Sequence, residues 1–299
     1  MLQVINPSVS IDFIKIRKAA FIFSALLIIG GLVSLFIKGG PDYGIDFTGG
    51  LMVHVGFDEG VSIGEVRAAV DGLGEGEISV QEFGATGSEF LLRVPTADTS
   101  VGGGRAAAIK EALREALPDS GLVEKRTEIV GPRVGKELRR RGILSVLFAT
   151  LMMGLYIAVR FQLRFGVGAG VALLHDVLIT VGALSLANIE VDLSVVAGLL
   201  TVVGYSVNDT VVVADRIREN MKRFSSQDIG PLINTSVNET LSRTVLTTGT
   251  SLLVLFALFF LGGGVIHGFA FTLIVGLTAG TYSSIFIASP VVEYMNAGR

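Results

Sequence analysis

Long apolar stretches with few charged residues are the main pattern along the chain. Six of them come close to the roughly 20 residues that an α-helix needs to cross a membrane. They lie at residues 19–37, 143–159, 166–187, 193–214, 244–263 and 267–292. This pattern predicts a polytopic α-helical membrane protein with six transmembrane helices. Because only residues 188–192 separate the third stretch from the fourth, these two helices must form an antiparallel hairpin.

A different pattern fills the segment between the first and second stretches. Residues 51–57 alternate between apolar and polar positions, as a strand with one buried face does. Strand-like and helix-like segments occur at residues 51–57, 62–73, 78–83, 89–95, 103–117 and 122–130. Their order, β-α-β-β-α-β, predicts a ferredoxin-like α+β domain over residues 38–140. His54 falls on the polar face of the first strand, so we expect it to be exposed to solvent rather than to act as a ligand.

The composition agrees with a membrane protein and narrows the class of function. Half of the residues are hydrophobic and 17% are charged, against roughly a quarter charged in an ordinary soluble domain. A net charge of −3 argues against nucleic-acid binding, because no basic excess is available to neutralise phosphates. There is no Cys, which excludes disulfides and Cys-ligated metals. No catalytic constellation or Walker motif occurs, so we expect neither an enzyme nor a cofactor.

Basic residues in the short connections predict the orientation. Lys and Arg are absent from the turns at 188–192 and 263–266. They cluster at Lys15, Arg17, Lys18, Arg160, Arg164, Arg216, Arg218, Lys222, Arg223 and Arg299. With six spans, all of these clusters fall on one side, which is the cytoplasmic one. Residues 1–18, the connection at 215–243 and the tail at 294–299 are then cytoplasmic, the helices after the first occupy 141–293, and the domain lies on the opposite side.

Two ionisable residues stand out within or beside the spans. Asp209 lies in the fourth span and Arg243 opens the fifth; such groups usually face the bundle interior and mark ion or proton paths. If these helices pack antiparallel, Arg243 lies at the cytoplasmic end of the bundle, close to the end of the fourth span that carries Asp209. Its long side chain can then extend towards the Asp209 carboxylate. Approach and separation of such a pair change the carboxylate's affinity for a proton, so a movable pair acts as a proton gate. The alternative is a static clamp between two helices. The polar side chains that could complete a network are Ser206, Asn208, Thr210, Thr247 and Thr248.

The third span carries a second ionisable pair, His175 and Asp176. Because they are adjacent, we expect them not to share one helix face. A metal site would need further ligands that the sequence does not offer, so none is predicted. Asp176 is expected to make an interior polar contact, with a secondary proton-relay role as a further possibility. Glycines four residues apart predict close helix packing of the small-xxx-small kind. They occur at Gly166 and Gly170 and at Gly276 and Gly280.

Five motifs together carry a family resemblance. They are DFTGG at 46–50, VGPRVGKEL at 130–138, HDVLITVG at 175–182, VGYSVNDTVVVADRIREN at 203–220 and SRTVLTTGTSLLVL at 242–255. In this order and spacing the chain resembles the SecF-type members of the SecD/SecF family, which belongs to the RND superfamily of proton-driven membrane machines. Each motif alone is a weak signal, and the series spans nearly the whole chain.

The resemblance implies an auxiliary subunit of the Sec translocase in a bacterial inner membrane, with its soluble domain in the periplasm. Such a subunit works with SecD and the SecYEG channel, and uses the protonmotive force to draw a translocating polypeptide outward. It also implies that Asp209 and Arg243 take part in proton conduction. Two other functions stay open: half of a small-molecule RND exporter, and a scaffold that conducts nothing. Sodium in place of the proton also stays open, because a carboxylate flanked by Asn and Thr suits either cation.

Overall fold

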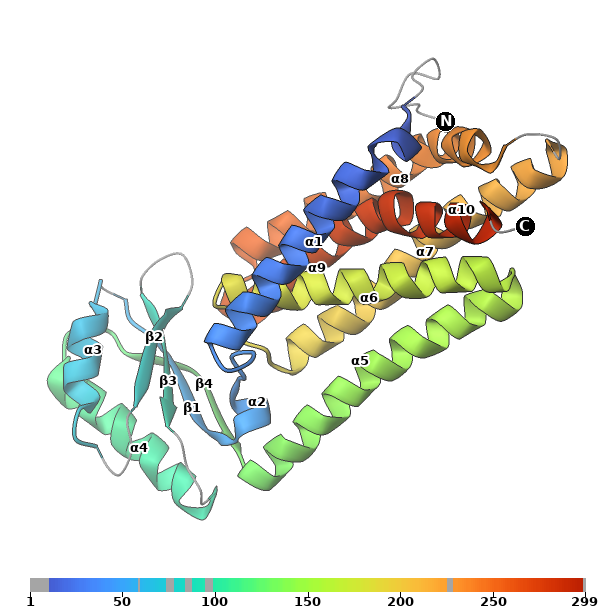
Figure 1. Cartoon of the computed structure of the whole chain (residues 1–299). Helices are drawn as coiled ribbons and strands as arrows, with labels where there is room; N and C mark the ends of the chain where they lie inside the picture. The colour runs from blue at the N-terminus through green and yellow to red at the C-terminus, as the bar shows by residue number, and fades with distance from the viewer. Residues whose placement is uncertain are drawn as a thin grey trace. The chain divides into compact units, whose positions relative to one another are not determined.

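The structure is a computed structural model and describes residues 11–58, 60–73, 78–83, 88–94, 99–224 and 228–297 (Figure 1). The described chain divides into two compact units. One, the soluble unit, comprises Tyr43–Ile143 together with a short segment, Gly262–Val265. The other, the membrane unit, contains the remaining helices.

The soluble unit has the predicted β-α-β-β-α-β order. Its strands are β1 (Gly50–Gly56), β2 (Ser79–Phe83), β3 (Glu89–Val94) and β4 (Val123–Val130), and its helices include α3 (Ile63–Val70) and α4 (Thr99–Ala116). The strands form one antiparallel sheet in the order β2-β3-β1-β4, which confirms the ferredoxin-like arrangement (Figure 1). The alternation in β1 has the expected cause, since Leu51, Val53 and Val55 are fully buried against the two helices.

His54 is a correction to the sequence-based prediction, because it is buried rather than exposed. Only 6% of the residue is accessible. Its Nε2 lies 2.7 Å from a carboxylate oxygen of Glu89 on the neighbouring strand. In the register of the sheet His54 lies opposite Leu91, so Glu89 is its diagonal neighbour, within reach of a long side chain. Alternation along one strand predicts which face of the sheet a residue lies on. It does not predict that a side chain of the neighbouring strand, here Glu89, covers that residue.

Two sequence motifs far apart in the chain meet where the soluble unit begins and ends. The short helix α2 (Ile45–Thr48) ends at Gly49, whose φ of 75° favours glycine. A Cβ on Gly49 would lie 2.6 Å from the Cα of Pro132, the first residue of the next long helix. A Cβ on Gly135 would lie 2.9 Å from the backbone nitrogen of Gly49. The glycines of the two motifs therefore permit a close backbone crossing.

The membrane unit confirms the six predicted spans. They fall within α1 (Phe13–Ile37), α5 (Pro132–Arg160), α6 (Leu163–Leu186), α7 (Leu193–Arg223), α8 (Ile229–Leu261) and a last helix. The last helix consists of α9 (Gly264–Ser283), the π-helical turn η1 (Ser284–Ala288) and α10 (Ser289–Ala297). All six are long and apolar enough to cross a membrane.

The segment 215–243, expected to connect the fourth and fifth spans, is largely helical in the structure. Helix α7 continues to Arg223 and α8 already begins at Ile229. Polar contacts hold these extensions together: Arg216 pairs with Glu239 at 2.6 Å, and the Asn220 side chain donates to Ser236 at 3.0 Å. Hydropathy marks only the apolar part of a helix, whereas these polar parts are stabilised by each other.

Glycines mark where the helices pack most closely. A Cβ on Gly276 would overlap the side chain of Val202 on α7, and one on Gly166 would overlap Ala158 on α5, which confirms the packing role predicted for these two glycines. The prediction is not borne out at Gly170, where a Cβ would meet no atom within 4 Å. A further contact was not predicted: a Cβ on Gly31 of α1 would lie 2.6 Å from the Cα of Gly182 on α6. The first and third spans therefore cross with their backbones in contact.

Candidate functional site

Asp209 lies on the buried face of α7 and is 3% exposed. Thr281 of the last helix donates a long hydrogen bond, 3.4 Å, to its Oδ2. The Thr281 hydroxyl is in turn 2.7 Å from that of Thr248 on α8. Two helices thus contribute a short row of hydroxyls that ends at the carboxylate.

Arg243 is exposed on α8. Within the described part of the chain, no cationic side chain lies within 4.0 Å of the Asp209 carboxylate, although the Arg243 charge acts on it at longer range. The helix geometry explains the separation. Thr244 and Thr248, four residues apart, are buried on the inner stripe of α8, and Arg243 precedes that stripe by one residue.

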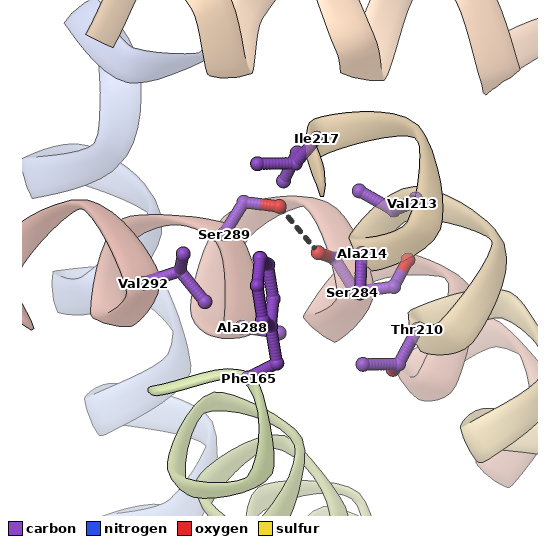
Figure 2. Close-up of a pocket in the computed structure, with 9 residues that line it drawn as sticks. All are labelled: Phe165, Thr210, Val213, Ala214, Ile217, Ser284, Ala288, Ser289 and Val292. Atoms are coloured by element: carbon purple, nitrogen blue, oxygen red, sulfur yellow. Dashed lines mark hydrogen bonds between the residues drawn. The ribbon is translucent and has the colours of Figure 1, made fainter. Parts of the chain in front are cut away.

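The other predicted network residues divide between different surroundings. Asn208 is exposed, and the Thr247 hydroxyl donates to the carbonyl of Arg243 in its own helix, so neither reaches Asp209. Thr210 is buried beside a small pocket that Phe165 and Ser284 also line (Figure 2). Its hydroxyl has no hydrogen-bond partner among the residues that the structure describes.

Ser206 belongs to another carboxylate, that of Asp176 on α6. Asp176 is completely buried, as an interior contact requires. Its Oδ2 accepts hydrogen bonds from Ser206 at 2.6 Å and from Ser283 at 2.8 Å. Its Oδ1 lies 2.9 Å from Nδ1 of His175. His175 and Asp176 are adjacent in α6, and their side chains nevertheless contact each other directly.

Three residues of this network were not predicted from the sequence. Ser24 of α1 contacts Nε2 of His175 at 3.0 Å, and Tyr282 stacks on the imidazole with the ring centres 5.9 Å apart. Ser283 is the third. The available signal was the run of hydroxyl residues at 281–284 in an otherwise apolar stretch, together with a serine, Ser24, in the middle of the first span. Within the described ranges, no group of three or more His, Cys, Asp or Glu side chains could hold a metal ion.

Comparison with known proteins places this architecture in a family. A family model for the protein export membrane protein SecD/SecF, C-terminal region, matches residues 109–298. The chain belongs to the SecD/SecF family. Curated relatives extend the match to nearly the whole length. The protein translocase subunit SecF of Magnetococcus marinus is 48% identical over 300 residues, which cover 99% of this chain and 96% of the relative. That of Vibrio alginolyticus is 42% identical over 289 residues, 97% of this chain and 91% of the relative.

Solved structures agree with this assignment. The crystal structure of SecDF from Thermus thermophilus, a translocon-associated membrane protein, matches with a TM-score of 0.86 and 35% identity over 98% of this chain. A second SecDF structure, in the super-membrane-facing form, matches with a TM-score of 0.69. The chain spans 40% of the length of each SecDF chain. This SecD/SecF family member is accordingly a multi-pass membrane protein of the Sec protein-export pathway.

Proposed function

We propose that this SecD/SecF family member, together with a SecD-type subunit, uses the protonmotive force to promote late steps of polypeptide export through the SecYEG channel. Protons pass Asp209, with Arg243 as the movable partner of the carboxylate, and their passage drives motion of the soluble domain, which holds or releases the emerging chain.

The proposal is carried by the burial of Asp209, since among the described residues no cationic side chain lies within 4.0 Å of its carboxylate. An isolated carboxylate charge inside a membrane is costly, and such groups are kept where they bind or move ions. A static clamp would place the two charges in contact, but among the described residues no cationic side chain lies within 4.0 Å of the Asp209 carboxylate, whose contacts are with the hydroxyls of Thr281 and Thr248. Arg243 lies one residue outside the buried stripe of α8, so a modest rotation of the helix changes its distance from Asp209. This arrangement favours a pair that opens and closes over a clamp.

The proposed orientation follows from the basic clusters. Both termini and the α7–α8 connection are cytoplasmic, and residues 38–140 are periplasmic in a bacterial inner membrane. Each proton that crosses releases about 2.3 kcal/mol per 100 mV, enough to bias a conformational equilibrium of a few kcal/mol. The SecD-type partner is supported by the match to SecDF, of which this chain accounts for 40%.

The test replaces the carboxylate without changing its shape. Membrane vesicles that contain Asp209→Asn and the partner subunits are loaded with a preprotein whose ATP-driven translocation has been stalled, and completion is followed with and without a protonmotive force. We expect Asp209→Asn to abolish the part of preprotein translocation that depends on the protonmotive force. Asp215→Asn is the matched control, because it makes the same change at an exposed position of the same helix.

Two outcomes would overturn parts of the proposal. Unchanged completion with Asp209→Asn excludes a proton path through that residue. Normal export by the double variant Asp209→Asn with Arg243→Gln supports the non-conducting scaffold instead. A protonophore and a sodium ionophore, applied separately to the wild-type vesicles, distinguish protons from Na⁺ as the coupling ion.

A further inference from the structure

A second buried hydrogen-bonded network crosses the membrane unit, and the proposed path through Asp209 does not use it. It joins α1, α6, α7 and the junction of α9 with η1. His175 and Asp176 form its centre, and both are nearly or wholly inaccessible, at 5% and 0% exposed. Ser24 lies at one end of the network and Ser206 at the other.

Tyr282 and Ser24 fix the direction of the hydrogen bonds at the α1 end. The Tyr282 hydroxyl lies 2.7 Å from the carbonyl oxygen of Ala20, and since a carbonyl can only accept, Tyr282 is the donor. Its single proton is then used, so Ser24 supplies the proton for the 3.1 Å contact between the two hydroxyls. Ser24 has only lone pairs left for His175. Nε2 of His175 therefore carries a hydrogen and donates it to Ser24.

The other ring nitrogen of His175 faces a carboxylate oxygen. Nδ1 lies 2.9 Å from Oδ1 of Asp176, and two acceptor atoms repel each other at that distance unless a hydrogen lies between them. A neutral imidazole has one N–H, which is already placed on Nε2. The contact therefore requires one additional proton, held on Oδ1 or on Nδ1. Ser206 and Ser283 occupy Oδ2 as donors, so the proton belongs on the Oδ1 side.

We infer that His175 and Asp176 form a second proton-binding site, in which one proton is shared between Nδ1 and Oδ1 and is gained or lost by the pair as a unit. The imidazolium–carboxylate and imidazole–carboxylic acid forms both have zero net charge, which suits a deeply buried site. The inference goes beyond the proposed function, because it holds whether or not protons pass Asp209.

Loss of the shared proton to water changes a contact of α1. The remaining imidazole hydrogen then moves to Nδ1, where it bonds to the Asp176 carboxylate, and Nε2 becomes an acceptor. To satisfy Nε2, Ser24 turns its hydroxyl from Tyr282 to His175. The proton state of the pair thus decides whether Ser24 of α1 donates to the last helix or to α6, and α1 is the span that precedes the soluble unit in the chain.

The surroundings of the pair agree with a switchable element. Tyr282 and Ser283 are the last two residues of α9; Tyr282 contacts Ser24 at one end of the network and Ser283 contacts Asp176 at its centre. The π-helical turn η1 follows at once, and such turns are frequent at functional sites. Of the titratable groups on the surrounding helices, Tyr282 stacks on His175, and Asp209 follows Ser206 by three residues on α7. The basic residues of α1 and α6 lie towards the helix ends.

Nitrogen-15 NMR of the histidines tests the inference directly, because the chain has only three, His54, His175 and His267. The full-length protein is labelled at histidine, reconstituted in lipid nanodiscs and titrated with pH; His54→Gln and His267→Gln assign the signals. We expect His175 to keep its hydrogen on Nε2 until a single transition moves it to Nδ1. In Asp176→Asn this transition is lost, although the side chain keeps its shape.

Further variants separate the inference from a static contact and from the Asp209 path. Ser24→Ala should shift the Nε2 signal of His175, whereas Ser34→Ala should not, although Ser34 also bonds across from α1 to α6, to Ser185 at 2.8 Å. Asp209→Asn should leave the His175 transition in place. A transition with an unchanged midpoint in Asp176→Asn, or an Nδ1-protonated His175 at every pH, would overturn the shared proton.

Discussion

In a soluble protein the buried segments are the more hydrophobic ones, but in the membrane unit the more buried inner helices are less hydrophobic than the outer helices. Half or more of the residues in the spans of α6, α7 and the last helix are buried, against 17% in each of α1, α5 and α8. The outer three are nevertheless the more hydrophobic. Lipid solvates apolar side chains as well as a protein interior does, so packing and interhelical hydrogen bonds rather than hydrophobicity select what is inside.

The soluble unit follows the usual rule, with the apolar face of its sheet buried beneath α3 and α4. In the membrane unit the buried positions include Asp176, His175 and Asp209. The comparison of inner with outer helices therefore predicts that disruption of small or polar inner residues costs more stability than removal of large apolar outer ones.

The largest effect is expected from a glycine between inner helices. Gly276→Leu forces a side chain into the space of Val202, and we expect the free energy of unfolding to fall by about 3 kcal/mol, at the upper end for overpacking. Denaturant titration in mixed micelles measures it. Gly249→Leu on α8 is the matched control, because a Cβ there meets no atom within 4 Å. Equal losses for both variants would contradict the distinction between inner and outer helices.

The next largest loss of stability is expected from replacing Asp176, whose carboxylate contacts His175. Asp176→Ala removes the acceptor of three hydrogen bonds, which are worth about 0.6 kcal/mol each within a membrane, so we expect a loss of about 2 kcal/mol by the same titration. Asp215→Ala, at an exposed position, should change stability little. If the Asp176 variant proves as stable as the wild type, its network is not holding the inner helices together.

Replacing Asp209 should lower the free energy of unfolding less than replacing Asp176. Asp209→Ala removes the 3.4 Å hydrogen bond from Thr281 and the weak contact of Thr248, and we expect the free energy of unfolding to fall by less than about 1 kcal/mol. Removal of a charge that is costly to bury works in the opposite direction and reduces the loss further. A loss as large as that of Asp176→Ala would mean that Asp209 is a structural clamp after all.

The smallest effect is expected on the outer surface. Leu151 of α5 is 69% exposed, and Leu151→Ala should change the free energy of unfolding by less than about 0.5 kcal/mol, as for other surface positions. Leu173→Ala on α6 makes the same change at a residue that is 1% exposed and should cost clearly more. Similar losses at the two leucines would show that α5 is packed against protein rather than lipid.

Much of the fold could be predicted because it depends on local pattern. Each apolar stretch became a helix, and the alternation in β1 became a buried sheet face. The helical extensions of α7 and α8 could not be predicted, since Arg216 and Glu239 stabilise them from two different segments. The same reason applies to His54, which Glu89 covers from another strand.

The candidate site was predicted less completely than the fold. The sequence identified Asp209 and Asp176 as ionisable groups inside spans, and both are buried. Ser206 was expected to bond to Asp209, three residues further along the same helix, but it donates to Asp176 on α6. Proximity in sequence does not decide which residue a side chain meets on a neighbouring helix. Ser24 and Tyr282 could be connected to His175 only when α1, α6 and the last helix were in place.

The sequence by itself determined the six spans, the β-α-β-β-α-β order, the family and the presence of costly polar groups within the membrane, because each of these depends on composition, periodicity or a linear motif. Only the tertiary structure decided which hydroxyl bonds to which carboxylate. It also decided that Asp176 contacts His175, whereas no cationic side chain of the described residues lies within 4.0 Å of Asp209. Partners in a helix bundle come from different segments, and their distances depend on where backbones such as those of Gly31 and Gly182 come into contact.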